Sequence, residues 1–451
     1  MIETLKNAFR NKDIRRKIFL TLLLLLVFRL GCYIPVPGLD RAQFENFITS
    51  GGNSFLQLMS GITGSALANG TVFALGIGPY INASIIVQLL TVGIPALERL
   101  SKEGEEGKKR LTLITRIITV ILAVVQSVGI IINFANESGS LNLSLFASKD
   151  PVTGEYPGWV LPVAGIYMTV IYTAGSMLVM WLGERITDLG VSNGISMIIF
   201  IGIISTAGMT LLNKFIAMGD GSLKVGDGLL EVGIFIILAA IIFFLVTFVD
   251  LAERKIPVQY AKQVRGTKMY GGQSSVIPMK ITGSGVMPLI FAYAIISFPS
   301  MIVGLFVKDE SVQLNLTKWF SGNGEWYGQL IYSLALCLLI FAFAFFYAQI
   351  QFNPEDVSKS IQQNGGFIQG IRPGKPTAQY LKKINNRITL FGAIFLALVA
   401  FIPSVVFSWA SKDLVNVFST TGILIVVSVA LELDKQLQSQ IMMKNYKGFL
   451  K

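Results

Sequence analysis

The residues that could do chemistry in this chain are few, and their types limit the chemistry. The sequence has no histidine, which excludes histidine-based acid–base catalysis and histidine metal sites. Its two cysteines, Cys32 and Cys337, fall far apart in apolar runs, where we expect small buried side chains. No GxxxxGK[ST], GxSxG or HExxH motif occurs. We therefore expect no enzyme, no cofactor and no metal site, and any energy must come from another protein.

Polar residues and prolines interrupt two of the apolar segments. Segment 76–97 contains Asn82, Ser84, Gln88 and Thr91, and segment 284–307 contains Ser284, Pro288, Ser297 and Pro299. Polar side chains are unfavourable in hydrocarbon unless they meet each other or a cavity, and proline removes a helix hydrogen bond. Two such loosely built helices could separate and let a molecule pass between them. The alternative is that these residues only join neighbouring helices.

Bulky aliphatic side chains are the second group of candidates. A solute transporter usually needs a charged or chelating site near the middle of the membrane, but the apolar segments hold only one clear charge, Arg29. Hydrophobic constrictions can instead close a pore by excluding water. Candidates for such a constriction are Ile77, Ile81, Ile199, Ile290 and Ile425. The alternative is that they face lipid or the helix core, as isoleucine in a membrane helix usually does.

These residues must be positioned by membrane-spanning helices. The chain is 53% hydrophobic and 14% charged, whereas a soluble protein carries about a quarter charged residues. Apolar runs of about 20 residues can cross a bilayer as helices. We predict ten spans, at 18–36, 76–97, 113–134, 159–182, 190–212, 229–249, 284–307, 327–350, 388–408 and 414–431.

The distribution of lysine and arginine predicts the orientation. Of the 37 such residues, 29 fall on the side of the two termini, 7 fall on the opposite side and Arg29 lies within a span. Because cytoplasmic loops carry the excess of positive charge, we place both termini in the cytoplasm of a multi-pass membrane protein.

One segment on the outer side is apolar but too short to span the membrane. Residues 54–68 read SFLQLMSGITGSALA. Such a segment can be buried as a re-entrant half-helix within the protein. An ordinary surface helix outside the membrane is the alternative.

Two cytoplasmic loops, 250–283 and 351–387, are long and basic. The first contains Arg254, Lys255, Lys262, Arg265 and Lys268; the second contains Arg372, Lys375, Lys382 and Lys383 around a Gly-Ile-Arg-Pro-Gly turn. Positive-inside topology explains charge near span ends but not loops of this length. Docking of a large acidic partner, such as ribosomal RNA or an ATPase, would use these residues.

A weak internal repeat relates the second span to the seventh. Both fit G-x-x-P-x-I-x-A-x-x-I, with Gly76, Pro79, Ile81, Ala83 and Ile86 in the first copy and Gly285, Pro288, Ile290, Ala292 and Ile295 in the second. Repeats of five spans must have inverted topology, and paired Gly/Pro-interrupted spans at corresponding positions point to the working site of such a fold.

Five long segments resemble the signature segments of the SecY family, in the family's order and along the whole chain. They are FRLGCYIPVPGLD (28–40), FALGIGPYINASIIVQLL (73–90), WLGERITDLGVSNGIS (181–196), ERKIPVQYAKQVRG (253–266) and FNPEDVSKSIQQNGGFIQGIRPGKPT (352–377). The resemblance implies an all-α integral membrane protein of ten helices. They would form two pseudo-symmetric, inverted five-helix halves, 1–220 and 221–451, with a re-entrant plug helix near 54–68.

The resemblance also implies roles for residues. Ile77, Ile81, Ile199, Ile290 and Ile425 would form the pore ring. A lateral gate would contain Asn82, Ile85, Gln88 and Phe298. The plug would include Phe55, Leu56, Met59, Gly61 and Leu67. Partner docking would use Arg254, Lys255, Lys262, Arg265, Lys268, Arg372 and Lys375.

The resemblance therefore predicts the central pore of a protein-secretion channel in the bacterial inner membrane. Such a channel passes unfolded secretory chains and releases membrane helices into lipid through the lateral gate. Implied partners are the small subunits SecE and SecG, the SecA ATPase, the ribosome, signal sequences, unfolded clients and membrane lipids. The alternative is a secondary solute transporter with inverted repeats.

Overall fold

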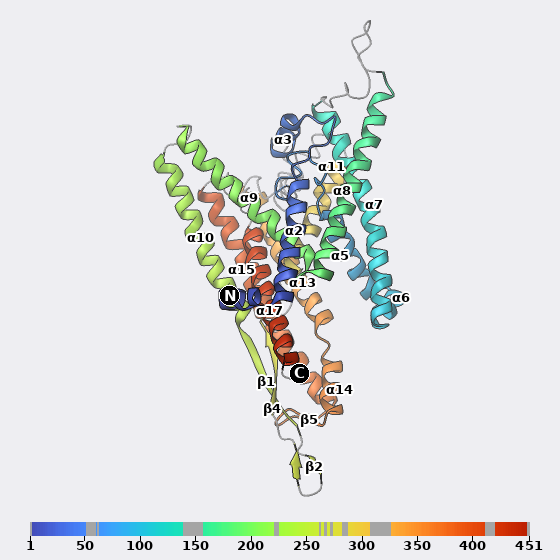
Figure 1. Cartoon of the computed structure of the whole chain (residues 1–451), viewed down its shortest axis with the longest axis vertical. Helices are drawn as coiled ribbons and strands as arrows, with labels where there is room; N and C mark the ends of the chain where they lie inside the picture. Colours follow the sequence, from blue (N-terminus) through green and yellow to red (C-terminus); the bar gives the residue numbers. More distant parts are fainter. Residues whose placement is uncertain are drawn as a thin grey trace.

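A computed structural model describes residues 2–50, 60, 63–138, 157–220, 225–260, 263–265, 268–270, 274–281, 287–306, 326–410 and 420–448. Most of them are helical. The helices are α1 (Ile2–Arg10), α2 (Lys12–Gly31), α3 (Arg41–Ser50), α5 (Gly78–Gly93), α6 (Pro95–Lys102), α7 (Glu105–Ser138), α8 (Val160–Leu189), α9 (Gly194–Gly219), α10 (Val225–Leu251), α11 (Met287–Phe306), α13 (Trp326–Gln351), α14 (Pro354–Gln363), α15 (Lys375–Ala410) and α17 (Thr420–Gly448). The long helices lie side by side in Figure 1, and both termini lie toward the end from which the strands project.

Each predicted span coincides with a helix of the structure, namely α2, α5, α7, α8, α9, α10, α11, α13, α15 and α17. Within the described residues, five helices are long and apolar enough to cross a membrane, or six when the bent pair α5–α6 counts as one span. The predicted all-helical membrane architecture is confirmed, whereas the full count of ten spans stays a prediction.

Two predicted boundaries are wrong. The first span does not reach residue 36, because α2 ends at Gly31, and the second span does not reach residue 97. Helix α5 ends at Gly93, and α6 leaves it at an angle of 103°. Pro95 begins α6 and has no backbone N–H to continue α5, and Ile94 before it adopts an extended conformation.

Asparagine side chains determine where three helices begin. The side-chain oxygens of Asn11, Asn193 and Asn353 accept hydrogen bonds from the first-turn backbone N–H groups of α2, α9 and α14 at 3.1–3.2 Å. These donors have no partner within their own helix, so a side-chain cap stabilises the first turn.

Residues 63–77 form a series of turns inside the bundle. The backbone φ angle is positive at Gly64, Ser65, Gly70 and Gly76, which a right-handed helix does not allow. The prediction of a helix over 54–68 is therefore wrong for residues 63–68; residues 54–59, 61 and 62 lie outside the described part of the chain.

This irregular segment is covered by protein, as backbone at membrane depth must be. The hydroxyl of Ser176 on α8 donates a hydrogen bond to the carbonyl of Gly76 (3.2 Å). Gly175 beside it has no side chain, and a Cβ atom there would overlap the carbonyl of Val72. Segment 63–77 therefore approaches α8 most closely at the small residues Gly175 and Ser176 of that helix.

Arg29 anchors the same segment from α2. Its guanidinium donates one hydrogen bond to the carbonyl of Gly64 (2.9 Å) and another to the hydroxyl of Tyr33 (3.2 Å). The buried Cys32 Sγ lies 4.0 Å from the carbonyl of Thr63. The only clear charge predicted within a span is therefore used to hold a backbone carbonyl.

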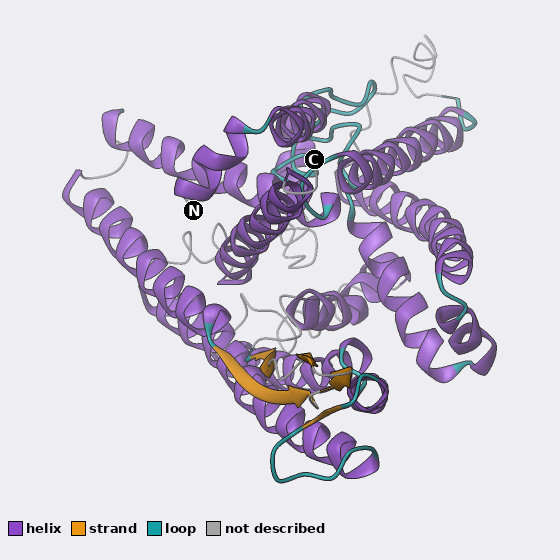
Figure 2. Cartoon of the chain, turned by 60° about the horizontal axis from the view of Figure 1, so that its bottom comes forward, coloured by secondary structure: helices purple, strands orange, loops and turns teal. Residues whose placement is uncertain are grey.

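Strands occur only outside the helical bundle in the described residues. Strand β1 (Glu253–Tyr260) lies between β4 (Ser274–Lys280) and β5 (Gly366–Phe367) in an antiparallel sheet, while β2 (Gln263–Arg265) pairs with β3 (Lys268–Tyr270). Figure 1 shows these strands at one end of the molecule, and Figure 2 brings that end forward. Within the described residues, the predicted loop 250–283 forms strands, and the predicted loop 351–387 contains α14, β5 and the start of α15.

Three hydrophobic cores fill most of the bundle. One includes residues of α3, α7 and α8 together with part of the segment 63–77. The N-terminal core is built from α2, residues 63–77, α8 and α9, and it also receives Ile425 and Val429 of α17. The C-terminal core is built from α10, α11, α13, α15 and α17, and it also receives Ile85 of α5. Each half of the chain therefore contributes side chains to the core of the other.

We expect Arg29→Met to loosen residues 63–70. Removing a hydrogen bond to a charged donor costs about 1.5–3 kcal/mol, which corresponds to roughly a 10–150-fold higher population of the opened segment. In a Cys337→Ser background, labelling of Cys32 by a membrane-permeant maleimide should accelerate accordingly.

Arg41→Met is the matched control, because Arg41 donates a 2.8 Å hydrogen bond to Asn69 at the exposed end of the same segment. Equal Cys32 labelling rates in the two variants would show that Arg29 does not hold the segment closed.

Candidate functional site

A cavity of about 680 Å³ lies between helices of the two halves. One end is apolar, and its lining includes Ile81, Ile199, Met287, Ile290, Phe291 and Ile425. Polar residues follow, including Ser84, Gln88, Asn193 and Ser196. The other end is charged and is lined by Asp250, Lys280, Glu432 and Lys435. Along α17 the lining passes from Ile425 to Lys435, so the two ends lie at different depths of the bundle.

The structure brings all five predicted ring isoleucines into one cluster. Ile77, Ile199 and Ile425 are buried in the N-terminal core, with 2–3% of their surfaces exposed. Ile81 and Ile290 are half-buried, line the cavity and pack against both cores. The contact between the two halves at the apolar end is therefore aliphatic.

The internal repeat has matching environments in its two copies. Pro79 and Pro288 are buried, Ile81 and Ile290 are half-buried, Ala83 and Ala292 are fully buried, and Ile86 and Ile295 are half-buried. Gly285 lies outside the described residues. Ile81 and Ile290 thus occupy equivalent places at the start of α5 and α11.

Three of the four predicted gate residues lie on α5 near this contact. Asn82 is buried, Ile85 is buried in the C-terminal core, and Gln88 lines the cavity. The Gln88 side-chain amide donates to the hydroxyl of Ser84 (3.4 Å). Phe298 belongs to α11, but its side chain lies outside the described part of the structure.

Of the predicted plug residues, only Leu67 is described. It is buried among Phe44, Phe47 and Phe134 of the neighbouring α3 and α7. Phe55, Leu56, Met59 and Gly61 fall outside the described residues.

The predicted docking residues gather on the strand-bearing end. Arg254 and Lys255 are exposed on β1, and Lys255 Nζ lies 3.5 Å from a carboxylate oxygen of Glu253. Arg265 and Lys268 are opposite each other in the β2–β3 register. Their side chains, and the whole of Lys262, lie outside the described part of the structure.

The second basic loop lies against the first. Strand β5 pairs with β1 at Gln259 and Tyr260, and residues of β1, β4, α14 and α15 share a small core. Arg372 and Lys375 are exposed on this unit. Positive φ angles at Gly370 and Gly374 make the turn around Arg372 tight, and Thr377 donates a 2.8 Å hydrogen bond to the Arg372 carbonyl.

The charged end of the cavity was not predicted as a site. Lys435 on α17 donates a 2.9 Å hydrogen bond to a carboxylate oxygen of Asp250 on α10. Each residue is a charge close after an apolar span, a pattern that the sequence shows. Their pairing joins residues 185 positions apart, which only the tertiary structure determines.

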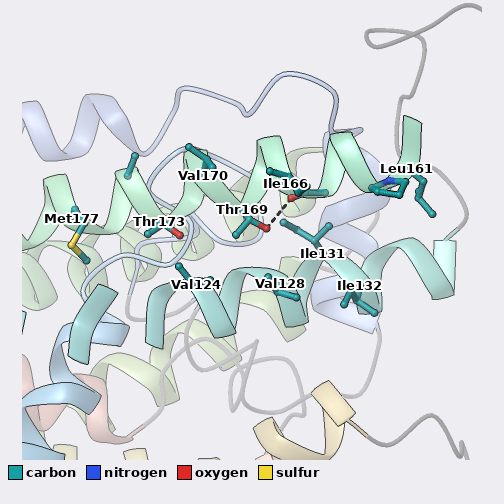
Figure 3. A pocket seen from close by; sticks show the side chains of 13 residues that line it. Val124, Val128, Ile131, Ile132, Leu161, Ile166, Thr169, Val170, Thr173 and Met177 are labelled. Carbon is teal, nitrogen blue, oxygen red and sulfur yellow. Dashed lines mark hydrogen bonds between the residues drawn. The ribbon is translucent and has the colours of Figure 1, made fainter. Parts of the chain in front are cut away.

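A second cavity, of about 730 Å³, lies between α7 and α8. Figure 3 shows its apolar walls, with Val124, Val128 and Ile131 on one side and Ile166 and Val170 on the other. Its polar side chains are two threonines, and Thr169 donates a hydrogen bond to the Gly165 carbonyl of its own helix (2.8 Å). Such a surface suits contact with lipid or another helix and offers no group for chemistry.

The described lining of the main cavity holds no nucleophile–base pair. The described residues contain no group of three or more potential metal ligands. What the arrangement can do physically is exclude water at the apolar end while the polar and charged walls remain hydrated.

Comparison with known proteins agrees with this geometry. A family profile described as SecY matches residues 71–433. The protein translocase subunit SecY of Streptomyces coelicolor is 40% identical over the whole of both chains.

Two solved structures match the fold at lower identity. One is a SecY channel whose plug domain is described as stabilising the closed state and maintaining a membrane seal; it is 19% identical, with a TM-score of 0.64, over 94% of this chain and 91% of that chain. The other is Sec61 in the canine ribosome–channel complex, 17% identical, with a TM-score of 0.62, over 94% and 91%.

These findings favour the protein-conducting interpretation over the solute-transporter alternative. The helical channel fold, the full-length match to a translocase subunit and the clustered isoleucines agree with one another. The chain belongs to the SecY family of protein translocase channel subunits.

Proposed function

We propose that the cavity is the cytoplasmic entrance of a protein-conducting pore and that the isoleucine cluster is its seal. The observation that carries the proposal is the position of Ile81 and Ile290, which pack against both cores at the apolar end of the cavity. Aliphatic side chains make a dry contact without directional bonds, so they can close around any client side chain. The function is conduction of unfolded secretory proteins, without a catalytic step.

A lateral gate between α5 and α11 would release membrane helices into lipid. Asn82, Ile85 and Gln88 lie on α5, and Phe298 lies in α11. The Gln88–Ser84 hydrogen bond on the cavity wall supports this proposal, because it lies within α5 and does not tie α5 to α11. A signal sequence would occupy this gate with its apolar part toward membrane lipids.

A plug near 54–68 would close the outer side. Its described residues 63–68 open the segment 63–77, which enters the bundle and carries Ile77 into the isoleucine cluster, and this supports the proposal. Phe55, Leu56, Met59, Gly61 and Leu67 would belong to this plug. The structural relative whose plug maintains a seal has the same fold.

Partners would supply the driving force and complete the channel. The exposed basic residues Arg254, Lys255, Arg372 and Lys375 lie on one compact unit, which suits a large acidic surface such as ribosomal RNA or the SecA motor. Lys262, Arg265 and Lys268 would extend this surface. The Sec61 relative was solved with a ribosome. SecE and SecG would be the small membrane subunits.

The bacterial inner membrane is the proposed location, with both termini in the cytoplasm. The positive-inside distribution supports this orientation. Residues 1–220 and 221–451 would act as two halves that move apart, which the two separate cores support.

We expect Ile81→Asn and Ile290→Asn to weaken the seal. Each buried aliphatic side chain contributes roughly 1.5–3 kcal/mol, and asparagine would hydrate the contact. Reconstituted variants should show a resting ion leak in planar bilayers and should transport clients with defective signal sequences.

Ile204→Asn is the control, because Ile204 of α9 is 40% exposed and does not line the cavity. Well-inserted ring variants with wild-type resting conductance and wild-type signal selection would rule out these isoleucines as the seal.

Arg372→Glu should impair docking of SecA or the ribosome while leaving membrane insertion intact. Like charges placed together in an interface cost several kcal/mol, so the apparent Kd should rise about tenfold or more. SecA affinity and ATP-driven transport in vesicles measure this directly.

Lys109→Glu makes the same charge change on the exposed start of α7 and should have little effect. If Arg372→Glu vesicles bind SecA and transport clients like wild type, the turn at Arg372 is not a docking site.

A further inference from the structure

The charged end of the cavity contains a compact cluster of four ionisable residues. Lys435 Nζ lies 2.9 Å from Asp250 Oδ2 and 3.5 Å from the Asp250 carbonyl oxygen. Neither side chain is freely solvated, with 33% of the Lys435 and 15% of the Asp250 side chain exposed. Glu432, one turn before Lys435, and Lys280 at the end of β4 complete the cluster.

The cluster is electrostatically interdependent. Burial and the neighbouring Lys435 ammonium lower the pKa of Lys280, while the carboxylates of Asp250 and Glu432 act in the opposite direction. Two cations and two carboxylates thus share a partly desolvated space, and removal of one partner leaves the others uncompensated.

This cluster lies where the β1–β4 hairpin leaves the helical bundle. Asp250 is near the end of α10, and β1 begins three residues later at Glu253. The returning strand β4 ends beside the start of β1: Lys280 is opposite Glu253 in the strand register, and the Ile281 amide donates a hydrogen bond to the Ala252 carbonyl (3.2 Å). The ion pair therefore attaches the root of the hairpin to α17.

The same helix carries a ring isoleucine. Ile425 precedes Lys435 by ten residues of uninterrupted α17, which corresponds to about 15 Å along the axis. A displacement of the hairpin root that moves α17 as a rigid element would shift Ile425 relative to Ile81 and Ile290.

We propose that Lys435 is a positioning residue that, through its ion pair with Asp250, couples movement of the β1–β4 hairpin to the isoleucine seal. This inference rests on the proposed function, in which the basic face of the hairpin docks a motor. The motor's contact is at the hairpin and the seal is in the bundle, so the root must be stiff for one to act on the other. Without the ion pair, the hairpin would pivot at residues 251–253 and leave α17 in place.

Three variants reconstituted with the small subunits test the coupling: Lys435→Met, the double neutral variant Asp250→Asn with Lys435→Met, and the charge swap Asp250→Lys with Lys435→Asp. Purified SecA is the probe, and both its Kd and the maximal rate of SecA-driven transport are measured. Lys102→Met is the control, because it breaks an exposed 2.7 Å ion pair with Glu98 on α6.

We expect Lys435→Met and the double neutral variant to bind SecA with unchanged Kd. Their maximal rate of transport should be at least about fivefold lower, and fivefold is the lower end of the range for coupling between two sites. The charge swap should recover most of the rate. The double neutral variant removes the uncompensated Asp250 charge, so its loss of rate cannot be assigned to misfolding if its melting temperature matches the wild type.

Three results would overturn the inference: a wild-type maximal rate in the double neutral variant, no recovery in the charge swap, or an equal loss in Lys102→Met. Failure of the proposed function looks different, because SecA would then fail to stimulate the wild-type channel at all.

Discussion

Inside a bilayer no water is available to hydrogen-bond the peptide backbone, and the rest of this structure depends on that constraint. Almost every described residue at membrane depth lies in a helix, where backbone groups pair internally. Residues 32–36 and 63–77 are exceptions, and there other groups replace the missing helix bonds: the Val72 amide donates to the Ile34 carbonyl (3.0 Å) and Arg29 donates to Gly64. The strands of the described residues lie outside the bundle, where water can satisfy their edges.

The absence of water also affects how the two proposed halves can touch and still separate. A contact made by directional hydrogen bonds would leave buried unpaired groups when it opened, at a cost of about 1–3 kcal/mol each. A contact made by Ile81, Ile290 and Ile425 leaves no such groups, and its strength follows the apolar area removed from water. The directional bonds are placed elsewhere, in Arg29–Gly64, Asp250–Lys435 and the bidentate Arg116–Glu184 pair of 2.7–2.9 Å between α7 and α8. The placement of directional bonds away from the proposed seal suits a channel whose cargo varies in sequence.

Much of the candidate site could be anticipated from local patterns. The repeat G-x-x-P-x-I-x-A-x-x-I placed Ile81 and Ile290 at equivalent positions, and the structure gives its described members matching burial. The basic residues of two loops were predicted to act together, and β1–β5 pairing places them on one unit. The prediction failed at 63–68 and at Ile94–Pro95. A helix-compatible composition does not reveal positive φ angles imposed by packing, and a proline within an apolar run can either kink a span or end it.

The sequence by itself determined the class of protein, and it predicts the positions of the spans and the side of the termini, because hydropathy and charge act through the solvent around each segment. Signature segments such as FALGIGPYINASIIVQLL also determined the family. Only the tertiary structure decided which distant residues meet. Ile425 joins the core of the other half, Arg29 finds the Gly64 carbonyl, and Lys435 pairs with Asp250. The physical reason is that each of these contacts depends on how helices pack and cross, which is a property of the whole bundle rather than of any one segment.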